Sequence, residues 1–127
     1  MGTFIATVIL FGFRINAGLA LAMLREEVSK HYPGSDEWTD AELLEQSDIL
    51  PLPLDFTIVC GVPDPYANIT DRPFYLGLAF YEIELSSMQE LLDTTKHPDF
   101  AKVVELAVQL GATDPKPAIH AFPIIDY

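Results

Sequence analysis

The sequence predicts an α+β domain in which four strands and two main helices follow the order strand, helix, strand, strand, helix, strand. Three observations lead to this prediction: runs of β-branched and aromatic residues, two stretches with apolar residues at helical spacing, and turn residues between them. The chain has 127 residues, 50% of them hydrophobic, which is the length of one domain and enough apolar surface for a core. We therefore treat residues 1–127 as a single domain.

The first strand and the first helix come at the start of the chain. Residues 3–13 are rich in β-branched and aromatic side chains, and both alternating sets are apolar toward the end, which indicates a central strand with both faces covered. Asn16 is in position to cap a helix over residues 17–31, and Pro33-Gly34 ends it. The apolar residues at helical spacing in this segment are Ala17, Leu21, Leu24 and Val28.

An acidic insert follows, over residues 35–54. Thr39 to Glu42 form a capping box, in which a hydroxyl and a carboxylate each satisfy a free backbone N–H, so we expect a short helix near residues 40–47. The Pro-Leu-Pro-Leu run at residues 51–54 is expected to be extended, because proline restricts its own backbone and that of the residue before it.

Two further strands are predicted on either side of a long loop. Residues 55–62 are apolar on one alternating face and mixed on the other, which is typical of an edge strand. Residues 74–85 are apolar on both faces as far as Glu82, which indicates a second central strand. The loop between them, residues 63–73, is too long for a tight hairpin and dense in turn residues.

The second helical region follows. A capping box at Ser87-Met88-Gln89-Glu90 predicts a short helix, and Pro98 at a first helical position predicts the start of the main second helix. Gly111 ends that helix, and residues 118–126 form the last strand, which Pro123 places at a sheet edge. The apolar stripe of the main helix consists of Phe100, Val103, Val104, Ala107 and Leu110.

This order of elements is that of a ferredoxin-like βαββαβ sandwich with an acidic insert between the first helix and the second strand. The first and third strands are then central, and both helices cover one face of the sheet. The other face is predicted to be apolar. Leaving it exposed to solvent would forgo roughly 25 cal/mol of stabilising free energy for each Å² of apolar surface. Either a second copy of the chain or the insert must cover it, and we expect a homodimer through the sheet face.

The chain is strongly acidic, with 19 Asp and Glu against 7 Lys and Arg and a net charge of −12. Phosphate backbones and anionic lipids repel such a surface, so we expect no nucleic-acid partner and no membrane. Nine carboxylates and no Lys or Arg lie from His31 to Asp71. They are interpreted as a solvated surface, as a face for a basic protein partner, or as oxygen ligands for a hard cation. The spacing of an EF-hand loop is absent.

Cysteine usage and the apolar N-terminus bear on the compartment. Cys60 is the only cysteine, which excludes an internal disulfide and suits a cytoplasmic protein. It falls in an apolar strand, so we expect a buried, inert thiol. The apolar run from Thr3 to Leu24 is interrupted by Arg14 and Asn16 and has no basic residue before it, so we do not interpret it as a signal peptide or a membrane span.

No motif of a known catalytic or nucleotide-binding class occurs, so the catalytic candidates are single residues. Arg14 lies in a glycine-flanked turn between the first strand and the first helix, where Arg14 and the helix N-terminus could hold an anion. His120 lies in an apolar strand and could act as a general base in a sheet-lined cleft. The three histidines lack metal-ligand spacing, so we expect no metal and no cofactor.

The insert and the long loop supply the binding candidates. Trp38 could anchor a partner or pin the insert to the sheet, and Tyr66 lies in the loop between the second and third strands. The acidic candidates are Asp36, Glu37, Asp40 and Glu42. The sequence leaves open whether the protein is an enzyme. The main hypothesis is a non-catalytic binding or protein-interaction module, and the alternative is a small cofactor-free enzyme of the dimeric α+β barrel type with His120 as its base.

Overall fold

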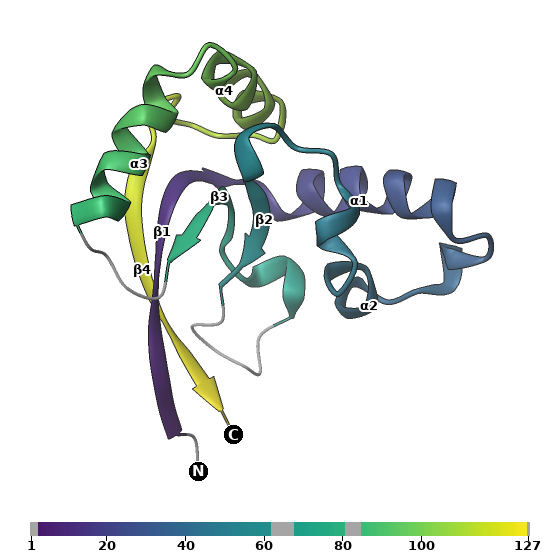
Figure 1. The fold of residues 1–127 in the computed structure, drawn as a ribbon. Helices are drawn as coiled ribbons and strands as arrows, with labels where there is room; N and C mark the ends of the chain where they lie inside the picture. Colours follow the sequence, from purple (N-terminus) through teal and green to yellow (C-terminus); the bar gives the residue numbers. More distant parts are fainter. Residues whose placement is uncertain (1–2, 62–67, 81–84, 127) are drawn as a thin grey trace.

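The computed structural model describes residues 3–61, 68–80 and 85–126 and shows an α+β fold built on a four-stranded antiparallel sheet (Figure 1). Its strands and main helices, in chain order, are β1 (Thr3–Ile15), α1 (Ala17–His31), α2 (Asp40–Leu44), β2 (Thr57–Cys60), β3 (Phe74–Phe80), α3 (Leu85–Lys96), α4 (Phe100–Gln109) and β4 (Ala118–Asp126).

The strand order in the sheet is β2-β3-β1-β4, with every neighbouring pair antiparallel. The two central strands are therefore β1 and β3, and the two edges are β2 and β4, as their apolar patterns predict. Gly12 of β1 lies opposite Gly77 of β3 on one side and Ala118 of β4 on the other. This register decides which side chains share a face, because successive residues of a strand point to opposite faces.

One face of the sheet carries the core. Phe13, Phe74 and Ile58 come from three adjacent strands and belong to one buried cluster. Both α1 and α4 contribute residues to that same cluster. Figure 1 shows that α1 runs from the end of β1 out past β2, away from the sheet, so the expectation that both helices lie over one face is not met by α1. The buried residues of the two helices are Ala20, Leu21, Leu24 and Val28 in α1 and Val103, Ala107 and Leu110 at α4. The two apolar stripes predicted from helical spacing face this cluster, with Ala17, Phe100 and Val104 half-buried and Ala20 buried in addition.

Local chemistry sets the ends of α1 and α4. The Asn16 side chain accepts a hydrogen bond from the Leu19 backbone N–H at 3.0 Å, which confirms the predicted cap of α1. After α4, Gly111 has a φ of +86°, a left-handed conformation that L-residues with a side chain rarely adopt. The backbone N–H of Asn16 donates to the Leu110 carbonyl at 2.8 Å, so the start of α1 and the end of α4 are tied together.

The insert packs into the core cluster on the first face of the sheet rather than across the opposite face. Leu43 and Leu50 belong to the same buried cluster as Phe13, and Figure 1 shows α2 lying beside α1. The capping box of Thr39 and Glu42 forms as predicted, although α2 ends at Leu44 and short 3-10 turns continue the insert. The alternative in which the insert covers the second face of the sheet is therefore wrong, because the apolar residues of the insert are used against α1.

The middle of the second face of the sheet is formed by small residues. Across the register, much of it consists of Gly12, Gly77 and Ala79, which offer little side chain. Two large residues on this face, Leu10 and Tyr75, are only 0% and 8% exposed within the single chain. These two residues therefore do not need a second copy to be buried.

Two strand boundaries also differ from the sequence expectation. β2 begins at Thr57, because Leu54 and Asp55 take left-handed conformations with φ of 57° and 61° and form a turn. Residue 62, at the expected end of this strand, lies outside the described residues. β3 is described to Phe80, and Leu85, expected in the strand, is instead the first residue of α3.

The starts of α3 and α4 are not where the capping patterns put them. Ser87 lies inside α3, so the predicted capping box does not open that helix. α4 begins at Phe100 rather than at Pro98. The reason is that His97 accepts hydrogen bonds from the backbone N–H groups of the two residues after Pro98. The His97 ring nitrogen Nδ1 accepts from the Asp99 N–H at 3.0 Å, and the His97 carbonyl accepts from the Phe100 N–H at 3.0 Å. Pro98 has no N–H and fits the turn between them.

Candidate functional site

Two regions contain the predicted site residues. The first is the acidic lobe, which we define as α1 together with residues 35–50. Arg25 on α1 holds the lobe together, because its guanidinium donates to the backbone carbonyls of Ser35, Asp36 and Trp38 at 3.5, 3.4 and 3.1 Å. The same group lies 3.6 Å from Asp40 Oδ1. Arg25 is thus already engaged by this part of the insert.

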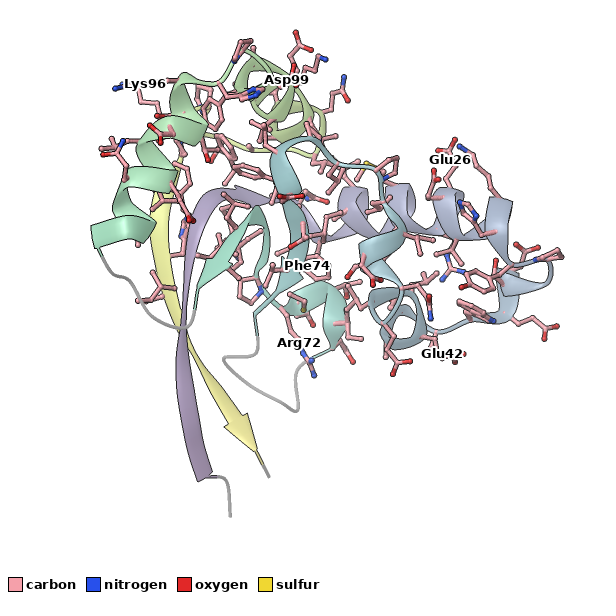
Figure 2. The ribbon with its side chains drawn as sticks, viewed as in Figure 1. Glu26, Glu42, Arg72, Phe74, Lys96 and Asp99 are labelled. Atoms are coloured by element: carbon pink, nitrogen blue, oxygen red, sulfur yellow. The ribbon has the colours of Figure 1, made fainter. Side chains whose placement is uncertain are left out.

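Most carboxylates of the lobe point outward. Six of them are exposed: Glu26 on α1 and five in the insert. We call the five of the insert the acidic face: Asp36, Glu37, Glu42, Glu45 and Asp48. Figure 2 shows Glu42 on the outer side of α2, away from α1. Among the described residues, no Lys, Arg or His forms an ion pair with any of the five. The predicted residue Asp40 differs from them, because it is half-buried and paired with Arg25.

Trp38 packs inside the lobe. Its ring lies 5.2 Å from that of Tyr32, measured between centroids, and it contacts the buried core cluster. The side chain is half-buried. These contacts are those of a residue that fixes the insert to the end of α1. Tyr66, the other predicted aromatic binding residue, lies outside the described residues.

The second region is a small pocket on the second face of the sheet, where the structure brings Arg14 and His120 together. It has a volume of about 130 Å³. Its lining comes from β1, from β4 and from the loop before β4: Gly12, Phe13, Arg14, Thr113, Asp114, Lys116, Ala118 and His120. The first turn of α1 is not part of this lining, so the predicted role of that helix N-terminus in holding an anion does not apply to the pocket.

Tyr75 links the two predicted residues. The Arg14 guanidinium carbon lies 5.6 Å from the centre of the Tyr75 ring, and the His120 ring lies 4.8 Å from it. In the register, Tyr75 and His120 are both diagonal neighbours of Gly12, on opposite sides of β1. The two rings therefore meet across β1 at the level of Gly12. A Cβ at Gly12 would lie 2.6 Å from the Gly77 Cα, so the sheet itself requires glycine there.

His120 has one nitrogen on the inside of this arrangement. Its Nε2 is buried and makes no hydrogen bond to any residue that the structure describes. A buried nitrogen without a partner costs about 1–3 kcal/mol. Since Nε2 is not accessible to solvent, a molecule in the pocket could contact only the other atoms of the His120 ring.

Sequence reasoning missed Lys116, which lines the pocket with Arg14. A single lysine in a loop gives no local signal, and only the pairing of β4 with β1 shows that it lies near Arg14. The neighbouring Asp114 shapes this loop, because its Oδ1 accepts the Lys116 backbone N–H at 3.0 Å.

The remaining titratable candidates have structural partners. His31 Nε2 lies 3.3 Å from Glu27 Oε1 in the last turns of α1. Burial raises the pKa of the Cys60 thiol above its ordinary value of 9.0, and the Arg72 guanidinium offsets only part of that rise. The thiol is therefore protonated at neutral pH, as expected for an inert cysteine, although Cys60 is half-buried rather than buried.

Within the part of the chain that the structure describes, no group of three or more His, Cys, Asp or Glu side chains is placed to hold a metal ion. Among the same residues, no helix is both long and apolar enough to cross a membrane. Comparison of the chain with protein families, with curated proteins and with solved structures finds no match. The assignment of a function therefore rests on the residues themselves.

Proposed function

We propose that the protein is a non-catalytic protein-interaction module whose contact surface is the acidic face. On this proposal the scaffold is ferredoxin-like, and residues 35–54 are an insert that carries the recognition surface. The observation that supports it is a firmly held segment whose five outward carboxylates have no cationic partner among the described residues. The partner would be a protein with a basic surface.

The physical case rests on how the lobe is held. Arg25, the capping box and the buried Leu43 fix the backbone of the insert, so little chain entropy is lost when a partner binds. Each exposed ion pair contributes only about 0–1 kcal/mol, so several must act together. A cluster of like charges also speeds association with a basic surface, and this effect weakens with salt.

The test compares two variants of equal net charge. In the first, Asp36, Glu37, Glu45 and Asp48 become the corresponding amides. In the control, the same change is made at exposed carboxylates outside the lobe: Asp55, Glu90, Asp93 and Glu105. Each variant removes four negative charges from −12 and has a net charge of −8.

The probe is an oligolysine peptide, with affinity measured by calorimetry at two salt concentrations. We expect the lobe variant to bind about tenfold more weakly than the control variant, which is a difference of about 1.4 kcal/mol. An equal loss in both variants would show that only net charge matters, and would refute the acidic face as the contact surface.

A second candidate function is that of a cofactor-free enzyme with His120 as general base and Arg14 as the anion-holding group. It is supported by the position of both residues in one pocket. The burial of Nε2 makes it the weaker candidate, because only the remaining ring nitrogen could accept a proton from a substrate. An active His120→Ala protein, for any substrate that the wild type converts, would remove this assignment.

We also propose that two copies associate through the second face of the sheet and that the protein is cytoplasmic. Ala79 and Ala118 are exposed on that face and uncharged, which favours the meeting of two chains that are both strongly acidic. The absence of any cysteine besides Cys60 supports the compartment. Light scattering at several protein concentrations tests the first proposal, and a monomer at all of them would refute it.

A further inference from the structure

The cationic side chains of this acidic protein differ in whether they pair with a carboxylate. Arg25, Lys30 and Lys102 each lie within 3.6 Å of a carboxylate oxygen. Arg14 and Lys116 instead line one pocket, and neither forms an ion pair with a residue that the structure describes. In a protein with a net charge of −12, two such cations in the lining of one pocket form a local site for a negative charge.

The surroundings of the pocket favour an anion over other ligands. The Tyr75 ring lies under the Arg14 guanidinium, where the face of the ring attracts the cation and restricts its position. Asp114 is the one carboxylate in the lining, and its Oδ1 is engaged by the Lys116 backbone N–H. Gly12 also lines the pocket and adds no charge to it.

The size and charge of the pocket limit the anion. A volume of about 130 Å³ is well below the roughly 300–1,000 Å³ of pockets for drug-sized ligands, so only a small molecule or one end of a molecule fits. Asp114 and the net charge of the protein disfavour a dianion more than a monoanion. A carboxylate carries one charge and matches the planar fork of an arginine with two parallel hydrogen bonds.

We propose that Arg14 and Lys116 bind a small carboxylate in this pocket, with Tyr75 orienting the arginine. The acidic face plays no part in this site, so the failure of either proposal would leave the other standing. The site also does not depend on His120 acting as a base.

The experiment is a titration of ¹⁵N-labelled protein with sodium acetate, followed by amide chemical shifts, with sodium chloride at equal ionic strength as the reference. We expect saturable shifts confined to the amides near Gly12 and those of residues 113–120. Arg14→Gln and Lys116→Gln are expected to raise the acetate Kd at least about tenfold each. Lys96→Gln is the matched control, because Lys96 is also exposed and lies at the end of α3, away from the pocket (Figure 2).

Each other outcome overturns the proposal in a distinct way. Shifts that are linear in acetate, or equal in chloride, would show that no carboxylate site exists. An acetate affinity unchanged by Arg14→Gln would assign binding to other residues. A parallel titration with inorganic phosphate tests the choice of anion, since tighter binding of phosphate would refute the preference for one charge. Both altered residues are exposed, so the variants are expected to fold, and the unshifted amides of α1 confirm this in the same spectra.

Discussion

Truncation of Leu43 tests whether the insert is an integral part of the core. This side chain is 0% exposed and belongs to the buried cluster that also contains Leu24 and Phe56. Leu43→Ala removes three buried carbon atoms, worth about 2.4 kcal/mol in transfer free energy at roughly 0.8 kcal/mol for each. A residual cavity adds to this, so we expect the free energy of unfolding to fall by about 3 kcal/mol and the Tm by roughly 10 °C.

The assay is urea unfolding followed by circular dichroism and by tryptophan fluorescence. Trp38 is the only tryptophan and lies in the acidic lobe, so its fluorescence reports on the lobe while circular dichroism reports on the whole chain. Leu92→Ala is the matched control, because Leu92 is 52% exposed and its truncation should cost less than about 0.5 kcal/mol. We expect the two transitions to coincide. A loss below about 1 kcal/mol for Leu43→Ala, or a fluorescence transition that precedes the other, would show that the lobe is a separate, weakly attached unit.

Three further predictions follow from single contacts. Asn16→Ala should lower the free energy of unfolding by about 1 kcal/mol, because the cap of α1 is lost. Asn68→Ala is the control and should have little effect, because the Asn68 side chain makes no capping hydrogen bond. Equal effects of the two changes in urea unfolding would contradict this prediction. Arg25→Lys should speed hydrogen exchange of the amides of residues 35–40, because an ammonium cannot reproduce the fork that reaches three carbonyls, while Lys30→Gln should leave that exchange unchanged. Because burial raises the pKa of Cys60, the unfolded thiol ionises first, so this residue should lower the stability as the pH rises above 9.0, and Cys60→Ala should remove that part of the pH dependence.

The elements that were predicted well are those whose signals are local. The bounds of α1 and β4 match the prediction, because a cap at Asn16, a helical stripe and a β-rich run with Pro123 each act within a few residues. The starts of α3 and α4 were missed for the opposite reason. A capping sequence shows only that a helix could begin at that residue. The start of α3 depends on where the chain leaves β3, and the start of α4 depends on how His97 accepts the free N–H groups of Asp99 and Phe100.

In the candidate site, too, some residues could be selected from local sequence and others could not. Arg14 and His120 were selected separately, one from a turn and one from a strand, and the register of β4 on β1 places them in one pocket. Lys116 and Tyr75 were not foreseen, because neither differs locally from an ordinary loop lysine or core tyrosine. Trp38 had two interpretations, and its contact with Tyr32 shows packing within the lobe.

The sequence by itself determined the composition of the protein's surfaces: a net charge of −12, an uninterrupted acidic segment, one cysteine, and apolar patterns that specify two central and two edge strands. These properties depend on residue type and on short-range periodicity, which are fully visible in a linear chain. Only the tertiary structure decided that the insert packs with α1, and that Tyr75 of β3 and His120 of β4 meet across β1. Those outcomes depend on contacts between residues far apart in the chain, whose free energy exists only once strand register and helix packing are fixed.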